Sequence, residues 1–102
     1  MIGLIATLTC GIATFYGVND GSSSITANGE RFNPYRWTAA HPHLPMGTKI
    51  RVTNQDNMKQ VIVRINDRGP YSHADIDLTY SAFAHIESTR RGNAVVCWRV
   101  IG

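Results

Sequence analysis

Residues 60–70 read Gln-Val-Ile-Val-Arg-Ile-Asn-Asp-Arg-Gly-Pro (QVIVRINDRGP) and contain the strongest strand pattern in the chain. Residues 60–65 are dense in β-branched side chains, which favour a strand. The strand ends abruptly after them, because Gly69 and Pro70 favour backbone conformations that a central strand does not use. The pattern predicts a strand that carries Asp67 at its end, with Arg68 directly after it.

Similar short patterns occur along the rest of the chain. Alternating or β-branched residues predict further strands at 11–16, 48–53, 76–78 and 94–101. Residues 54–59 (NQDNMK) predict a hairpin turn, and residues 79–86 (TYSAFAHI) have the spacing of one short helix. Many short strands around one or two short helices are typical of a small β-barrel, so the expected fold class is mainly β.

Three further segments have a distinct composition. Residues 1–9 are mostly apolar and lack the basic start of a secretory signal, so we expect a first strand there rather than an export signal. Residues 17–36 are rich in Gly, Ser, Asn and Asp and predict a long loop, which in a small domain is often functional. Residues 38–46 contain two prolines, which exclude the interior of a regular helix.

Length and charge limit the classes of protein that this chain can be. Its 102 residues, 43% of them hydrophobic, predict a single folded domain over 1–102, with a monomer as the default. No apolar run approaches the roughly 18 residues of a membrane span. The net charge of +3 suits an acidic polymer as partner. Scattered basic residues and the lack of a nucleic-acid motif argue against nucleic acid.

The two cysteines, Cys10 and Cys97, lie near opposite ends of the chain and belong to no CxxC pair. A zinc site of the usual spacing is therefore not expected. The pair His41 and His43 brackets a proline and also lacks a ligand pattern, so no metal or other cofactor is expected. The first and last strands of a closed barrel are often neighbours, which allows a disulfide; two buried free thiols are the alternative, and the sequence leaves both open.

Polar residues gather in three segments, 26–30 (TANGE), 38–41 (TAAH) and 66–70 (NDRGP). Each alone has a structural explanation, because an Asp after a strand often caps a turn and a Glu in a turn is often simply solvated. Together they predict a site, since functional side chains concentrate at loops and strand ends. Asp75 and Asp77 share one face of the next strand, and a buried carboxylate there would need hydrogen-bond donors.

The same segments carry a family resemblance over nearly the whole chain. Residues 63–71 (VRINDRGPY) resemble the "VRINDRGPF" segment of the RlpA-like (rare lipoprotein A) family of the bacterial cell envelope, and five more motifs match in order. These are 11–17 (GIATFYG), 26–30 (TANGE), 38–41 (TAAH), 44–48 (LPMGT) and 76–79 (IDLT). The resemblance implies a six-stranded double-psi β-barrel with one or two short helices.

The resemblance also implies an activity and its residues. The family includes lytic transglycosylases of the septal-ring type, a class of lyase that acts on peptidoglycan glycan strands in the envelope or periplasm. Its active-site acids and histidine correspond to Glu30, His41 and Asp67, all present here, and Asp77 matches a supporting residue. The expected location is therefore the cell envelope. A catalytic module alone would suit a secreted effector or a phage-delivered lysis protein (an endolysin).

The remaining candidate residues are assigned to substrate binding. Asn28 and Arg68 are candidates for binding the glycan, and Tyr16, Trp37 and Tyr71 for stacking on sugar rings, with core or rim packing as the alternative. The family's Trp and two Phe residues are replaced by Phe15, Met46 and Tyr71 here, which could alter a sugar platform.

A transglycosylase can use a single acid twice, first as proton donor and then as base. Asp67 is our first choice for this acid, and Glu30 is the alternative. Arg68 is expected to point away from Asp67, because a cation beside the acid would hold it ionised. Two other functions remain open from the sequence: an expansin-like module that binds glycan without cutting it, and a glycoside hydrolase, which uses two carboxyl groups and water.

Overall fold

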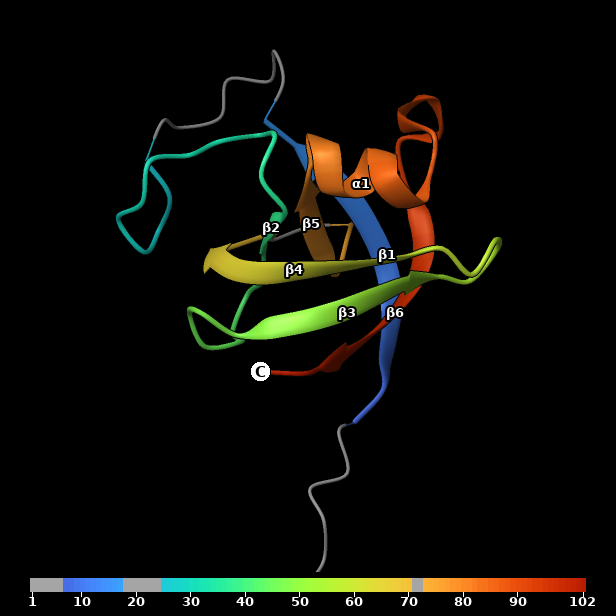
Figure 1. Cartoon of the computed structure of the whole chain (residues 1–102), viewed down its shortest axis with the longest axis horizontal. Helices are drawn as coiled ribbons and strands as arrows, with labels where there is room; N and C mark the ends of the chain where they lie inside the picture. The colour runs from blue at the N-terminus through green and yellow to red at the C-terminus, as the bar shows by residue number, and fades with distance from the viewer. Residues whose placement is uncertain (1–6, 18–24, 71–72) are drawn as a thin grey trace, which may run out of the picture.

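The structure, a computed structural model, describes residues 7–17, 25–70 and 73–102. Its six strands close into a barrel in the order β1-β5-β2-β4-β3-β6 (Figure 1). The strands are β1 (Thr9–Tyr16), β2 (Thr38–Ala40), β3 (Lys49–Asn54), β4 (Gln60–Asp67), β5 (Ile76–Thr79) and β6 (Ala94–Val100). The expected six-stranded barrel is therefore confirmed.

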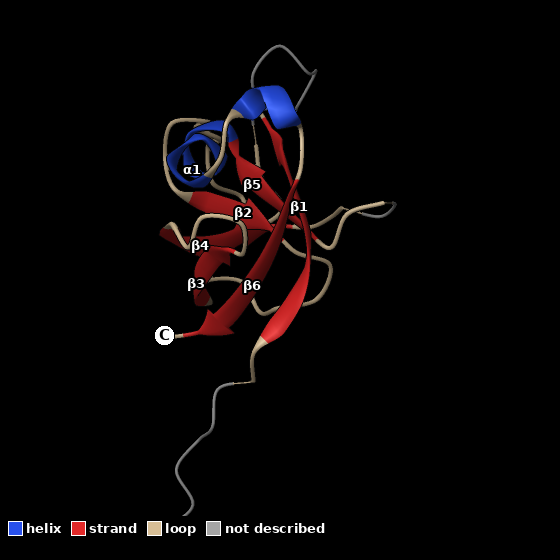
Figure 2. Cartoon of the chain, turned by 90° about the vertical axis from the view of Figure 1, so that its right-hand side faces the viewer, coloured by secondary structure: helices blue, strands red, loops and turns tan. Residues whose placement is uncertain are grey.

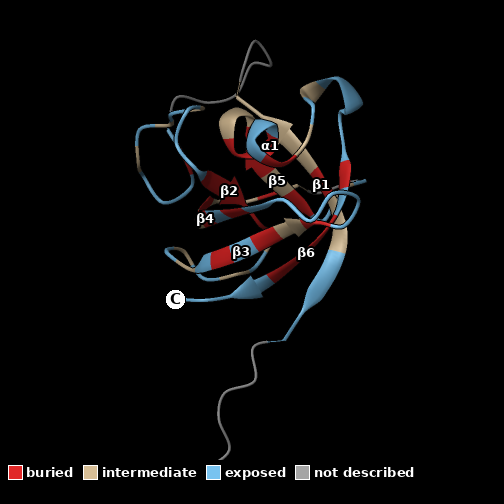
Figure 3. Cartoon of the chain, turned by 45° about the vertical axis from the view of Figure 1, so that its right-hand side comes forward, coloured by how far each residue is buried: buried red, intermediate tan, exposed pale blue. Residues whose placement is uncertain are grey.

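The barrel core follows from the two-residue period of β3 and β4. Ile50 pairs with Val63 and Val52 with Val61, and all four residues are buried. Figure 3 shows buried and exposed bands alternating along β3. Inward-facing aliphatic side chains of this kind are the main source of stability in a small barrel. The hairpin turn expected at residues 54–59 joins these two strands.

One α-helix and a short 3-10 helix lie at the same end of the barrel (Figure 2). The helix α1 (Tyr80–Ile86) begins after Thr79, whose side-chain oxygen accepts a hydrogen bond from Ala82 N–H as an N-cap. Its Phe83 is fully buried in the core. The 3-10 helix (Thr89–Arg91) follows directly. No helix in the described parts of the chain is long and apolar enough to cross a membrane.

The observed elements agree with the sequence predictions within one or two residues, with two differences. The strand expected within residues 1–9 falls mostly outside the described residues, and β1 begins only at Thr9. The sequence did not predict β2, because its three residues are all buried and show no alternation.

The pairing of β2 explains how two of the polar segments meet. This strand lies between β4 and β5, parallel to β4, with Ala40 opposite Asp67 after a local bulge. The residue after β2 is His41, and its backbone N–H donates to the carbonyl oxygen of Asp67 at 3.2 Å. The barrel therefore places the ends of the TAAH and NDRGP segments beside each other.

Candidate active site

The loop of residues 26–30 is tethered to the end of β4. Ala27 N–H donates to Asp67 Oδ1 at 2.9 Å, and Asn28 N–H donates to the carbonyl of Asn66 at 3.2 Å. Within the loop, the Asn28 side-chain oxygen accepts from the Thr26 hydroxyl and from Glu30 N–H. Figure 1 shows this segment beside the arrowhead of β4. Two of the segments expected to form a site are thus joined by direct contacts.

Glu30 is held by a two-point ion pair. Arg64 donates from Nη1 to Oε1 at 3.0 Å and from Nη2 to Oε2 at 2.8 Å, and Asn66 Nδ2 donates to Oε1 at 3.0 Å. These donors, the Arg64 guanidinium first, lower the pKa of Glu30 to about 2, although partial burial opposes the shift. Glu30 is therefore a carboxylate at neutral pH and cannot supply a proton there.

Asp67 is held through one oxygen only. Its Oδ1 accepts from Ala27 N–H and from Arg68 N–H, each at 2.9 Å. Among the described residues no donor contacts Oδ2, and the side chain is half-buried. The preceding strand and the following glycine fix its place, since Gly69 has a φ of 114°, a conformation that other residues rarely adopt. One oxygen of this carboxyl group can therefore meet a substrate.

Arg68 points away from Asp67, as expected. Its Nη1 donates to the carbonyl oxygens of His41 at 3.2 Å and Leu44 at 2.8 Å. The guanidinium thus holds the loop that follows β2 instead of a carboxylate. The Arg68 head group braces the site through these two carbonyl oxygens and, among the described residues, forms no ion pair with Asp67.

His41 is buried and acts as an acceptor. Its Nδ1 accepts from His43 N–H at 3.2 Å and from Leu44 N–H at 3.0 Å, which requires an unprotonated Nδ1. Burial, with the charges of His43 and Arg68, lowers its pKa, and Asp75 opposes the shift. The ring lines a hollow of about 210 Å³ together with Asp75 and Trp98, and it does not line the cleft of Glu30. Only the backbone N–H of His41 contacts Asp67.

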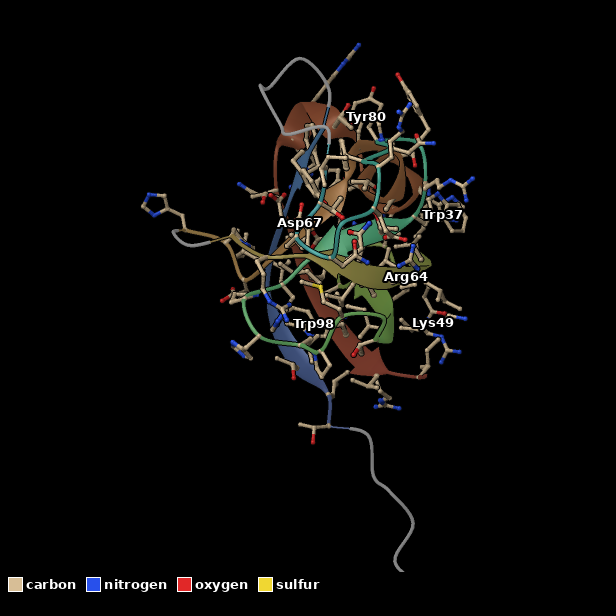
Figure 4. The ribbon with its side chains drawn as sticks, turned by 90° about the vertical axis from the view of Figure 1, so that its left-hand side faces the viewer. Trp37, Lys49, Arg64, Asp67, Tyr80 and Trp98 are labelled. Atoms are coloured by element: carbon tan, nitrogen blue, oxygen red, sulfur yellow. A yellow bond between two sulfur atoms is a disulfide. The ribbon has the colours of Figure 1, made fainter. Side chains whose placement is uncertain are left out.

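A cleft of about 470 Å³ opens beside Glu30. Its walls carry three arginines, Arg31, Arg36 and Arg64, and the remaining lining residues are Glu30, Asn33, Thr38 and Asn66. Asp67, at the end of β4, is not among the residues that line this cleft. In the view of Figure 4, Trp37, Arg64 and Lys49 follow one another along one edge, and Asp67 lies nearer the middle of the molecule. A cleft lined by polar and charged side chains suits a polar ligand better than a small apolar one.

The structure separates the other predicted site residues. Tyr16 stacks on Phe32 with ring centroids 5.1 Å apart, and Asp77 Oδ1 accepts from the Thr14 hydroxyl, so both contribute to packing. Trp37 is 45% exposed, and its ring contacts that of His85 in a tilted arrangement. Tyr71 lies outside the described residues.

In the described ranges, no cluster of three or more His, Cys, Asp or Glu side chains could hold a metal ion.

Several residues at the site were missed by the sequence analysis, and Arg31 and Asn33 on the cleft wall are among them. Arg64 and Asn66 fix Glu30, and Arg36 lines the cleft. One signal was present for Arg64, because an arginine within an otherwise aliphatic strand needs a partner when it is partly buried. Nothing in the sequence identified that partner as Glu30, which lies 34 residues away.

A disulfide joins Cys10 to Cys97 across the paired strands β1 and β6. The two cysteines are directly opposite each other in the strand register, and 87 positions separate them in sequence. The described part of the chain contains no free cysteine. The bridge therefore connects the first and last strands of the barrel.

The stability of this site should depend on pH. The folded pKa of His41 lies below its unfolded value of 6.5, so the unfolded chain binds more protons as pH falls through 6.5, and stability is lost. Glu30 acts in the same direction at lower pH, where stability is lost as pH falls from 4.5 towards 2. We expect Tm to fall between pH 7.5 and 5.5, measured by circular dichroism. His41→Gln should flatten this slope, whereas substitution of the exposed His73 by Gln should leave it unchanged.

The comparisons with known proteins agree with this architecture. A family model described as lytic transglycolase matches residues 8–98. A probable endolytic peptidoglycan transglycosylase RlpA of Nostoc sp. is 50% identical over 94 residues, covering 90% of this chain and 25% of the relative. The endolytic peptidoglycan transglycosylase RlpA of Helicobacter pylori is 47% identical over 93 residues, covering 90% of this chain and 29% of the relative. The chain thus spans about a quarter of the length of these relatives.

Solved structures share the fold at low sequence identity. A papain inhibitor of Streptomyces has a TM-score of 0.77 at 21% identity, covering 94% of this chain and 96% of the inhibitor. An expansin of Clavibacter michiganensis, solved as a mutant in complex with cellohexaose, has a TM-score of 0.75 at 18% identity, covering 94% of this chain and 51% of the expansin. The fold is therefore the double-psi β-barrel that the sequence resemblance implied.

Proposed function

The chain belongs to the lytic transglycolase family, and on that premise we propose that it cleaves peptidoglycan glycan strands as a lytic transglycosylase. The bond cut is the β-1,4 link between N-acetylmuramic acid and N-acetylglucosamine. The names of the relatives, endolytic peptidoglycan transglycosylases, support this substrate. The place of action would be the cell envelope, reached by secretion or phage delivery.

The reaction needs one proton donor and no water. A carboxyl group gives its proton to the oxygen of the scissile bond as the bond from C1 of muramic acid breaks. The C6 hydroxyl of the same sugar then bonds to C1, and its proton returns to the carboxylate. Atoms balance within the glycan, which ends in 1,6-anhydro-muramic acid. A single residue can serve as acid and then as base.

Asp67 fits the role of this acid-base residue. One of its oxygens is fixed by two backbone N–H groups, and no described residue donates to the other. The carboxyl group is therefore oriented and still has an oxygen that can bind and release a proton. A donor must lie within hydrogen-bond reach of the leaving oxygen, and the end of β4, at the tether of the 26–30 loop, provides a rigid support for it.

Glu30 fits a second role, that of a permanent anion. The observation that carries our assignment is the two-point contact with Arg64, which keeps Glu30 ionised. Cleavage of a glycosidic bond passes through a positively charged, oxocarbenium-like transition state. A carboxylate whose orientation Arg64 fixes can stabilise that charge, although the ion pair with Arg64 offsets part of its own. Two carboxyl groups in different environments thus take different roles, as in other enzymes that act on glycans.

The products test this proposal directly. We expect purified protein to release fragments with 1,6-anhydro-muramic ends from peptidoglycan, identified by mass spectrometry. Fragments with reducing muramic ends would instead show a hydrolase that uses water. Binding without any fragments would support expansin-like action on the glycan. The assay should include both intact and peptide-stripped peptidoglycan, because the stem peptides could block access to the cleft.

A further inference from the structure

Beyond Glu30, the cleft continues over the outer side of β4. A second hollow of about 410 Å³ shares Arg36, Thr38 and Arg64 with the first. A third, of about 250 Å³, shares Trp37 with the second and ends at Ile62. We call this second and third hollow together the outer groove. It is continuous with the cleft that holds Glu30, and the mechanism above does not use it.

The outer groove is cationic. Arg36 and Arg64 line its first part and Arg51 its second, and none of the described residues that line either part is acidic. The Arg64 guanidinium is already paired with Glu30. Across residues 7–17, 25–70 and 73–102, the only other ion pair joins Arg91 to Glu87, so Arg36 and Arg51 have no carboxylate partner there. Uncompensated guanidinium groups beside a cleft attract an anionic ligand.

Trp37 forms a fixed aromatic surface at the centre of the outer groove. Its ring is 45% exposed and lies against the ring of His85 on α1, with centroids 4.6 Å apart. Its carbonyl oxygen accepts from Arg64 N–H at 3.3 Å, which ties its backbone to β4. An exposed aromatic ring that is already ordered loses little entropy when it binds a ligand.

The backbone of Arg36 is anchored as well. Its carbonyl oxygen accepts from the Thr79 hydroxyl at 2.6 Å and from Thr38 N–H at 3.1 Å. The side chain itself is exposed, and it lines both the first cleft and the outer groove. Arg36 therefore occupies a fixed position between the cleft beside Glu30 and the aromatic ring of Trp37.

We propose that the outer groove binds the glycan strand beyond the cleaved bond, with Trp37 stacked on a sugar ring and Arg36 paired with a free muramic carboxylate. This inference rests on the proposed function, because a strand cut in its interior must extend past the site. Muramic acid carries the only carboxyl group of the glycan backbone, which is free in stripped strands and amide-linked to the stem peptide in intact ones. Charge and continuity with the cleft both favour this occupant.

Binding to a non-cleaving background separates the groove from the chemistry. The test uses Asp67→Asn protein, shown first to release no products, and soluble peptide-stripped glycan, with affinity measured by calorimetry. We expect Arg36→Gln to weaken binding about tenfold, since a charge-assisted contact is lost. Trp37→Ala should weaken it by a similar factor. Arg90→Gln, on the 3-10 helix away from the groove, should bind as the background does.

A second ligand tests whether Arg36 binds the carboxylate group of the glycan. On glycan whose carboxyl groups are converted to amides, Arg36→Gln should cause no further loss, whereas Trp37→Ala should still weaken binding. If both variants bound the stripped glycan as tightly as the background protein, the proposal that the outer groove binds glycan would be wrong. Tighter binding of a phosphate polymer such as teichoic acid than of the glycan would also overturn it.

Failure of the proposed groove and failure of the proposed function give different results in these experiments. If the wild-type protein cuts glycan and the two groove variants bind normally, the proposed role of the outer groove is wrong and the proposed function is supported. If no glycan is cut but both variants lose affinity, glycan binding in the outer groove is supported and the proposed function is wrong. Circular dichroism of each variant checks that the fold is retained.

Discussion

Asp67→Asn is expected to lower the rate of glycan cleavage by roughly 10²- to 10⁴-fold, the range typical of a lost general acid-base group. The amide cannot give a proton and take it back, so both halves of the reaction fail. The fold should survive, because Asn retains the Oδ1 acceptor for the N–H groups of Ala27 and Arg68. Anhydro-muramic ends released per minute, counted by mass spectrometry, measure the effect, and an unchanged Tm confirms that the fold is intact.

Two further variants and a control decide the roles of the carboxyl groups. Asp56→Asn, in the exposed hairpin turn, is the matched control and should retain full activity. Glu30→Gln should reduce the rate by removal of a fixed anion, and Arg64→Gln should reduce it too by releasing that anion from its position. If Asp67→Asn remained active and Glu30→Gln alone abolished the products, Glu30 would be the acid and our assignment would be reversed.

Removal of the disulfide should have the largest effect on stability. The bridge closes nearly the whole chain, with 87 positions between its cysteines, and a loop of this length contributes about 4 kcal/mol in the entropic account. Replacement of both Cys10 and Cys97 by Ala is expected to lower the free energy of unfolding by about 2–4 kcal/mol. In a domain of this size, that corresponds to a fall in Tm of roughly 10–20 °C.

Reduction of the wild-type protein provides the control for this variant. Wild type in a strong reductant should unfold at the same temperature as the doubly substituted protein, and the latter should be insensitive to reductant. Alanine is used because Cys97 is buried and a serine hydroxyl there would lack a partner. Equal stability of the oxidised wild type and the variant would show that barrel packing alone holds β1 to β6.

The core strands of the barrel could be predicted because their pattern is local. The β-branched stretch at 60–65 and its break before Pro70 define β4 and place Asp67 at its end. The hairpin to β3 and the helix α1 show their own periodicities. In contrast, β2 has three buried residues between two neighbouring strands, and so short and uniform a segment carries no periodic signal.

The site was predicted as a set of residues but not as a set of contacts. The sequence placed Glu30, His41 and Asp67 in one site, yet the structure turns the His41 ring into a separate hollow and joins only its backbone to Asp67. Periodicity describes neighbours along one element, and it carries no information on which way a side chain turns at a strand end.

By itself, the sequence determined the class of fold, most of the strands and the candidate carboxyl groups, because hydrophobic periodicity and turn residues act over a few positions. Only the tertiary structure decided that Arg64 pairs with Glu30, that Arg68 holds the loop after β2, and that Cys10 meets Cys97. These contacts join residues 24 to 87 positions apart, and only the closure of the barrel brings their strands and loops together.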